Sequence, residues 1–456
     1  MNKRIDLTEG SISEKLIKLS LPIMGTSFIQ MAYNMIDMIW VGRDGSKAVA
    51  AVGTAGFYPW LAMAFIMISK IGGEVKVAQS IGMHDTIETK KYIKSSLELN
   101  IILAFLYSSV MLIFNRQLIE LFNLGDSEVI SMSKNYLIIV SVGMIFTFLN
   151  PLFTSIFNGM GNSRTPFLIN TCGLCVNIIL DPVLIFGFHN IPALGVSGAA
   201  IATVTAQILV SMLFIIVILR NNDSLFKIKL FRNIDCKYHK IIIKIGFPLA
   251  VQNGLFTIFS MIMGILVASF GPVAIAAQKV GSQIESISWM SADGMAAALS
   301  TFVAQNFGAG KYDRIKTGIK NGIIVALIWG TFTTLILILF NTVIFSLFIN
   351  EPEAIIKGAD YLKILGFSQV FMCIEITVCG IFKGFSRTFI PSAVGIIFTG
   401  ARIPLAYILS KPEYLGLNGI WWSISISSMF KGVILLGIFI ILYKCKKIYN
   451  AEPHSI

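Results

Sequence analysis

The stretch LSLPIMGTSFIQMAYNMIDMIWVG, residues 19–42, is mostly apolar over a length that matches the hydrocarbon core of a bilayer. A transmembrane helix needs about 20 consecutive, mostly apolar residues, so this stretch predicts a membrane span. One carboxylate, Asp37, interrupts it. An aspartate at the centre of a membrane helix costs roughly 2.5–3.5 kcal/mol, and such residues usually face a bundle interior or a wet cavity. Asp37 is therefore expected to have a function, although a simple bond to a neighbouring helix would also account for it.

The composition of the whole chain is typical of an integral membrane protein. Of the 456 residues, 55% are hydrophobic and 13% are charged, and the mean hydropathy is +0.78. Soluble domains carry about 25% charged residues. The net charge of +12 does not indicate nucleic-acid binding, because no long basic polar segment with aromatic residues accompanies it. The six cysteines suggest no disulfide framework, and the C-x-x-C at 172–175 has no second ligand pair nearby to complete a metal site.

The same criterion predicts twelve spans along the chain. They lie near residues 15–40, 50–77, 93–114, 131–155, 166–188, 195–219, 241–268, 272–304, 318–347, 357–382, 390–410 and 417–443. The expected organisation is an N-terminal six-helix lobe at 1–219, a basic cytoplasmic linker at 220–240 and a C-terminal six-helix lobe at 241–456.

The basic residues of the loops predict the orientation of the chain. With twelve spans, 24 of the 36 Lys and Arg fall on the side of the two termini, and 5 fall on the opposite side. Loops rich in Lys and Arg stay in the cytoplasm. Both termini are therefore expected to be cytoplasmic, in a multi-pass protein of the plasma membrane.

The two halves of the sequence resemble each other. Several matching positions are 226 residues apart: Pro22 and Pro248, Gly45 and Gly271, and the segments AQSIG at 78–82 and AQNFG at 304–308. Each repeat contains six spans, an even number, so both halves must enter the membrane in the same direction. The repeat predicts two lobes related by a pseudo-twofold along the membrane normal, with a cavity between them.

Several motifs together resemble the multidrug and toxic compound extrusion (MATE) family, and the resemblance covers almost the whole chain. They are EGSISEKLIKLSLPIM at 9–24, the AQ-x-x-G endings of the second and eighth spans, NGMGNSRTP at 158–166, NIILDP at 177–182 and LGVSGAAIAT at 194–203. The resemblance implies a two-lobed, twelve-helix exporter that exchanges its substrate for Na⁺ or H⁺. Asp37 with Asn177 and Asp181 resembles the DinF-like branch, whose cation chemistry lies in the N-terminal lobe. Tyr136 matches by position a family tyrosine that lines this site.

The spacing of the polar residues supports a cation-coupling site in the first lobe. Gln30, Tyr33, Asn34 and Asp37 recur at helical spacing and form a polar stripe, which could also line a substrate cavity. Asn177 and Asp181 are four residues apart and share a helix face. Two carboxylates and an amide would suit Na⁺, which prefers oxygen ligands, and they would equally suit a proton.

Pro22 is expected to kink the first helix, because proline removes one backbone hydrogen bond. The kink makes Pro22 a candidate hinge, although proline is also common in membrane helices for packing reasons.

The second lobe is expected to differ from the first. Met263 occupies the position that pairs with Asp37, so the cation site is not duplicated. Glu285 and Glu375 are candidate cavity acids that would attract a cationic substrate. A structural ion pair of Glu375 with Arg402 is the alternative.

These observations favour a secondary active exporter that antiports amphipathic, mostly cationic organic compounds against Na⁺ or H⁺. The alternative is a flippase for a lipid-linked oligosaccharide or another amphiphile. An enzyme is not expected, because the chain has no Walker loop and no H-E-x-x-H motif, and its four histidines lie in expected loops or the tail. The expected partners are small organic cations or amphiphiles and membrane lipid, the expected state is a monomer, and no cofactor beyond the coupling ion is expected.

Overall fold

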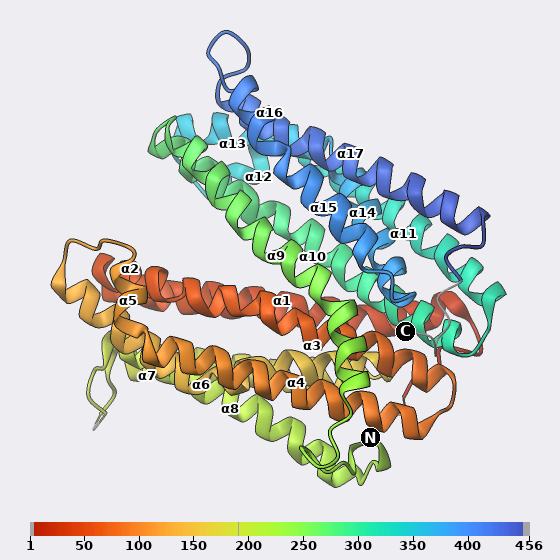
Figure 1. Ribbon diagram of the computed structural model, residues 1–456. Helices are drawn as coiled ribbons and strands as arrows, with labels where there is room; N and C mark the ends of the chain where they lie inside the picture. Colours follow the sequence, from red (N-terminus) through yellow and green to blue (C-terminus); the bar gives the residue numbers. More distant parts are fainter. Residues whose placement is uncertain (1–3, 190, 450–456) are drawn as a thin grey trace. The chain divides into compact units, whose positions relative to one another are not determined.

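The computed structural model describes residues 4–189 and 191–449, and this part of the chain is almost entirely α-helical (Figure 1). The elements are α1 (Ile12–Asp44), α2 (Ser46–Ala55), α3 (Phe57–Gly82), α4 (Thr86–Ile113), α5 (Asn115–Glu120), α6 (Ser127–Gly159), α7 (Arg164–Phe186), α8 (Gly195–Asn221), η1 (Ser224–Phe226), α9 (Cys236–Ala268), α10 (Pro272–Gly308), α11 (Tyr312–Leu339), α12 (Asn341–Ser346), α13 (Pro352–Gly366), α14 (Gln369–Gly384), α15 (Phe389–Gly400), α16 (Arg402–Leu409) and α17 (Leu417–Lys444).

All twelve expected spans fall on helices or on broken helix pairs. Within the described residues, nine helical segments are long and apolar enough to cross a membrane, and α13 with α14, bent by 51°, would make a tenth. The other two are α1 and α10, which are long but interrupted by polar and charged side chains. The expectation of an all-helical membrane protein is confirmed. The span expected at 318–347 ends instead at Leu339, because Phe340 leaves helical geometry and the short α12 follows.

The helices form two compact units. Among the described residues, the first consists of 4–6 together with 25–250, and the second consists of 7–24 together with 251–449. This division differs from the expected lobe boundaries at 1–219 and 241–456, because the first part of α1 packs in the second unit and the first part of α9 packs in the first. The expected boundaries, as lobes of a sequence repeat, stay a prediction.

The sequence repeat is visible in the local structure of the two units. Helices α4 and α11 both have 28 residues, and both are followed by a six-residue helix. The glycines that begin matching helices adopt similar left-handed backbone angles, with φ of 125° at Gly45 and 93° at Gly271, and of 53° at Gly195 and 56° at Gly416. These φ values favour glycine at each position. The two halves of the sequence therefore fold into the same order of helices and turns.

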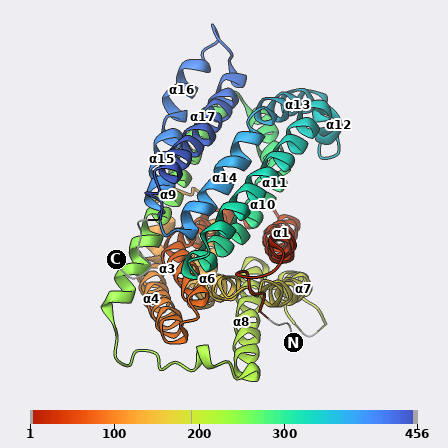
Figure 2. The ribbon, with the colours of Figure 1, turned by 90° about the vertical axis from the view of Figure 1, so that its right-hand side faces the viewer.

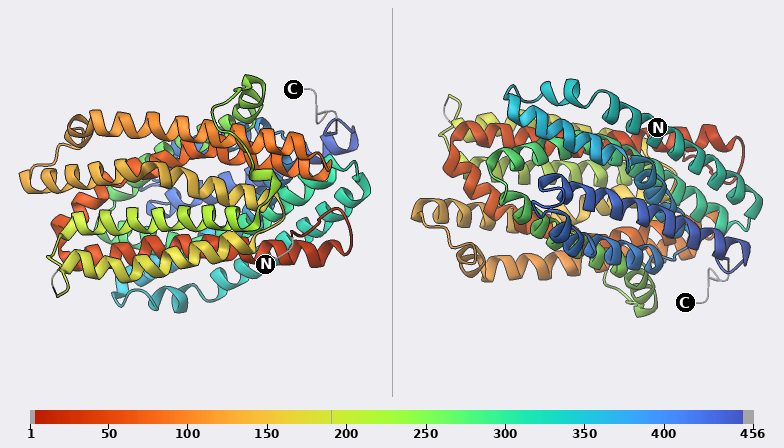
Figure 3. Two further views of the ribbon diagram at one scale, coloured as in Figure 1. Left: turned by 90° about the horizontal axis from the view of Figure 1, so that it is seen from below. Right: turned by 90° about the horizontal axis from the view of Figure 1, so that it is seen from above.

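In the first unit, α3 packs on α4 and α6, α6 packs on α8, and α7 packs on α8 (Figure 3). The first part of α9 approaches α3 closely enough that only glycine fits. A Cβ at Gly72 would lie 2.3 Å from the carbonyl oxygen of Ile242, and one at Gly246 would lie 2.0 Å from that of Ile68. Small residues at such contacts are how membrane helices gain close packing.

In the second unit, α14 contacts α10, α11 and α17 (Figure 2), while α15 and α16 lie against α17. Trp421 of α17 is fully buried in an apolar cluster with residues of α10, α11 and α13. Its indole Nε1 donates a hydrogen bond of 3.1 Å to Oε1 of Gln278, and its ring meets that of Tyr361 edge to face.

A buried carboxylate, Glu98 of α4, holds the segment that connects α8 to α9. The backbone N–H of Phe231 donates to its Oε1 over 2.8 Å, and Lys94 forms an ion pair with the same oxygen at 3.6 Å. His239 Nε2 lies 3.3 Å from its Oε2, and the side chain of Glu98 is 1% exposed. Glu98 thus accepts a hydrogen bond from the connecting segment and lies close to Lys94 of α4 and His239 of α9.

We expect Glu98→Ala to destabilise the protein by about 1–3 kcal/mol, because it removes the acceptor of the Phe231 N–H and the carboxylate that pairs with Lys94. The measurement is the apparent melting temperature of the purified protein in detergent, together with the rate of proteolysis in the segment 222–236. Glu120→Ala is the matched control, since Glu120 pairs with Arg116 on the surface and should change stability little. Equal stability of the two variants would contradict the role of Glu98.

Candidate functional site

The candidate cation site lies in the first unit, where three helices bring polar side chains together. Helix α1 supplies Asp37, α6 supplies Tyr136, and α7 supplies Asn177 and Asp181. Asn177 and Asp181 lie one helical turn apart, so Nδ2 of Asn177 donates a hydrogen bond of 2.9 Å to Oδ1 of Asp181. Both side chains are fully buried, and Asp37 is partly buried. The structure therefore brings together the residues that the sequence predicts for this site.

Several oxygen atoms at this site have no hydrogen-bond partner among the described residues. They are Oδ1 of Asp37, Oδ1 of Asn177, Oδ2 of Asp181 and, on α8, Oγ1 of Thr203. Buried polar atoms nearly always have a partner, so these oxygens are expected to bind a water molecule, a proton or a cation. They are carboxylate, amide and hydroxyl oxygens, the ligands that hard cations take. The same carboxylates could instead accept a proton.

The charges of the site favour a cation. Asp37 interacts electrostatically with Asp181, and Tyr136, which is 6% exposed, interacts with both. Two carboxylates in low-dielectric surroundings repel each other strongly. The described part of the chain has no cluster of three or more His, Cys, Asp or Glu, so a site here would use two carboxylates with neutral oxygens. A single bound Na⁺ or H⁺ would relieve the repulsion.

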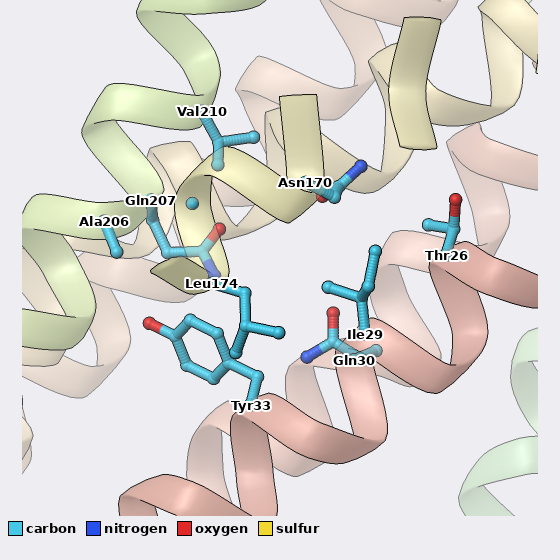
Figure 4. A pocket seen from close by; sticks show the side chains of 10 residues that line it. Thr26, Ile29, Gln30, Tyr33, Asn170, Leu174, Ala206, Gln207 and Val210 are labelled. Carbon is cyan, nitrogen blue, oxygen red and sulfur yellow. The ribbon is translucent and has the colours of Figure 1, made fainter. Parts of the chain in front are cut away.

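A small cavity of about 20 Å³ lies beside this site, between α1, α7 and α8 (Figure 4). Gln30 and Tyr33 of α1 line it, with Asn170 of α7 and Gln207 of α8. The hydroxyl of Tyr33 donates a long hydrogen bond of 3.4 Å to the carbonyl oxygen of Thr203. A polar cavity of this size can hold one water molecule. It is too small for a drug-like substrate.

The remaining residue of the expected α1 stripe, Asn34, is exposed and does not line this cavity. The sequence pattern did not predict the residues that α8 contributes, Thr203 and Gln207. A hydroxyl or an amide in an apolar segment is too common to single out, and only the packing of α8 against α6 and α7 brings these two to the site.

In the second unit, the two candidate acids are already bonded. Glu285 accepts hydrogen bonds from Tyr361 at 3.3 Å and from Nε2 of Gln369 at 3.1 Å. Glu375, 8% exposed, forms an ion pair of 3.0 Å with Lys431 of α17.

The alternative pairing of Glu375 with Arg402 is wrong. Arg402 instead donates to the hydroxyls of Ser427 and Ser428, at 2.6 and 3.0 Å. The sequence pattern did not single out Lys431, although a lysine inside an apolar span is a signal that could have revealed it.

The position that pairs with Asp37 is apolar in the second unit. Met263 of α9 is 4% exposed and packs in a cluster with Val267, Ala406 and Ile420. This packing agrees with the expectation that the cation site occurs once.

Comparison with known proteins identifies the family. The MatE family model matches residues 22–183 and 248–408, one segment in each half of the chain. The chain is 28% identical to "Probable multidrug resistance protein NorM" of Thermotoga maritima, over 94% of this chain and 92% of that protein. It is 24% identical to the "FAD transporter" of Shewanella oneidensis, over 95% of each.

Among solved structures, the fold is similar to that in "Crystal structure of MATE in the straight conformation", with a TM-score of 0.89 and 22% identity, over 98% of this chain and 99% of that one. The family match covers well over half of the sequence and both copies of its repeat. This chain therefore belongs to the MatE family.

Proposed function

We propose that this protein is a secondary active multidrug exporter, which antiports amphipathic, mainly cationic organic compounds against Na⁺ or H⁺. Membership of the MatE family and the likeness to a NorM protein named for multidrug resistance support this proposal. The proposed coupling of transport to an ion rests on one observation: oxygens of Asp37, Asn177 and Asp181 lie within the helix bundle without a hydrogen-bond partner among the described residues. Such a group is costly within a membrane unless an ion or a proton completes it.

Helix α1 offers a route from ion binding to conformational change. Asp37 and Pro22 lie on the same helix, and α1 passes from the second compact unit into the first between Met24 and Gly25, just after Pro22. Proline removes a backbone hydrogen bond and allows the helix to bend there. An ion that binds Asp37 better in one conformation than in another would shift the equilibrium between them. Pro22 is proposed as the hinge of this change.

The finer assignments follow from the same features. We place the protein in the DinF-like branch, because its acids lie on α1 and α7 while Met263 replaces Asp37 in the repeat. It would act as a monomer in the plasma membrane with both termini in the cytoplasm, as the asymmetry of the basic residues predicts. Glu285 and Glu375 stay candidates for attracting cationic substrate, although Glu375 would first have to break its ion pair with Lys431.

A second candidate function is the transport of an anionic amphiphile, such as a lipid-linked oligosaccharide. The buried Lys431 and the partly buried Arg402 in the second unit favour it, because cationic side chains would bind a phosphate group. One relative is named as a transporter of FAD, which is itself anionic. Efflux assays with cationic and anionic cargo in the same liposomes would decide between the two functions.

We expect Asp37→Asn and Asp181→Asn each to lower ion-driven efflux by roughly tenfold or more, because an amide neither takes up a proton near neutral pH nor neutralises Na⁺. Both variants should express and fold, since each removes a buried charge with little change in shape. The measurement is drug efflux from liposomes with matched protein amounts, under Na⁺ and H⁺ gradients imposed separately.

Asp313→Asn is the matched control, because Asp313 is exposed at the start of α11. Efflux by Asp37→Asn within twofold of the control would mean that the ion couples elsewhere. Loss of efflux under only one of the two gradients would identify the coupling ion.

The proposed orientation predicts which loops reagents can reach. In a chain whose six native cysteines are replaced, Gly125→Cys should react with an impermeant maleimide added outside cells, and Lys229→Cys should react only after lysis. Both positions are exposed, so the reagent can reach each cysteine whenever it is on the same side of the membrane. Labelling in the reverse pattern would overturn the assignment of both termini to the cytoplasm.

A further inference from the structure

The second unit contains a cavity of about 220 Å³ between α9, α15 and α17. Phe256 and Phe259 of α9 form part of its apolar wall, and Gln252, Asn253 and Thr399 line it with amide and hydroxyl groups. Engineered cavities of about 150 Å³ bind benzene. This cavity is larger, so it can hold an aromatic ring together with a small polar group.

Lys431 is the one charged residue among those that line the cavity. An ammonium group has three N–H donors, and Glu375 Oε2 lies 3.0 Å from that of Lys431. The other two donors remain for a ligand or for further polar groups. A cationic ligand in this cavity would lie beside a like charge, whereas an anionic group could complete the hydrogen bonding of Lys431.

The surroundings of Lys431 contain further positive charge. Arg402 interacts electrostatically with both Lys431 and Glu375, and also with Glu285. Yet Arg402 donates to the hydroxyls of Ser427 and Ser428, and no ion pair joins it to an acid within the described residues. Glu285 is occupied by Tyr361 and Gln369. The two cations Lys431 and Arg402 and the two acids Glu375 and Glu285 therefore balance in charge, and of these four Lys431 is the one that lines the cavity.

Gln252 provides an additional polar group. Its Oε1 is buried and has no hydrogen-bond partner among the residues described here. A Cβ on Gly395 would lie only 2.4 Å from its Nε2, too close for an unbonded contact. The absence of a side chain at Gly395 thus leaves room for the Gln252 amide at the cavity. A carboxylate can accept only from its Nε2, because Oε1 is itself an acceptor.

We propose that this cavity is a binding site for small aromatic acids, with the carboxylate on Lys431 and the ring against Phe256 and Phe259. The site goes beyond the proposed cation-coupled export, because none of its residues belongs to the group around Asp37. The proposed site would also be selective, because it would bind an aromatic acid more tightly than the corresponding amide or amine.

The test compares three probes of similar shape, 2-naphthoate, 2-naphthamide and 2-naphthylmethylammonium, by calorimetric titration of the full-length protein in neutral detergent. We expect naphthoate to bind about tenfold or more tightly than naphthamide, as a charge-assisted hydrogen bond would give, and the ammonium probe to bind most weakly. Equal affinities, a preference for the ammonium probe, or no binding of naphthoate would overturn the proposal.

Variants then locate the site. The neutral pair Lys431→Gln with Glu375→Gln should abolish the preference for naphthoate, while Glu375→Gln alone should strengthen it, because the ammonium loses its paired carboxylate. Gly395→Ala should weaken naphthoate and naphthamide alike by displacing Gln252, and Gly437→Ala, where a Cβ meets nothing within 4 Å, is the matched control. Unchanged binding in the double variant would overturn the role of Lys431, even if Gly395→Ala proved unstable.

Two further experiments distinguish binding at this site from cation coupling and from lipid binding. Asp37→Asn should retain the preference for naphthoate, so a failure of cation coupling and a failure of this site give different results. Phosphatidylglycerol added to the detergent should not displace naphthoate. Displacement at equimolar lipid would assign the cavity to a lipid head group and would overturn the assignment to aromatic acids.

Discussion

The hydrocarbon core of a membrane offers no hydrogen-bond partner to a peptide group, and every long helix of this protein follows from that constraint. The chain satisfies it by closing its backbone hydrogen bonds within each segment, and the breaks between α2 and α3, α13 and α14, and α15 and α16 are short. Where helices must approach one another, glycine replaces larger residues, as at Gly72 and Gly246. Packing in such a protein depends on shape rather than on a hydrophobic difference between helix and lipid.

The same constraint makes polar side chains within the helices informative. In the second unit, Glu375 and Lys431 neutralise each other, and Arg402 is bonded by serine hydroxyls. In the first unit, Asp37 and Asp181 have no cationic partner in an ion pair among the residues described, and several oxygens around them have no donor. Cations that belong to the protein thus compensate charge in one unit. At Asp37 and Asp181 in the other unit, we propose that an ion or a proton from solution supplies the compensation.

The two units show how one succession of helices can serve two purposes. Helix lengths, turns and the left-handed glycines recur, while the side chains at matching positions differ. Met263 lies in an apolar cluster where the first unit has Asp37. Backbone geometry is kept because the turns need glycine at positive φ. Side chains that face a cavity are not restricted in this way, and they can diverge between the repeats.

The sequence by itself determined the membrane class, the places of the twelve helical segments and the repeat, because apolar length and glycine position are local properties of the chain. It also predicted Asp37, Asn177 and Asp181, since a charge within an apolar span has few possible roles and the i, i+4 spacing puts two of them on one face. Only the tertiary structure decided which side chains meet. Thr203 and Gln207 join the first site through the packing of α8, and Glu375 pairs with Lys431 rather than Arg402. These contacts join residues dozens of positions apart, and no local pattern encodes the rotation of one helix against another.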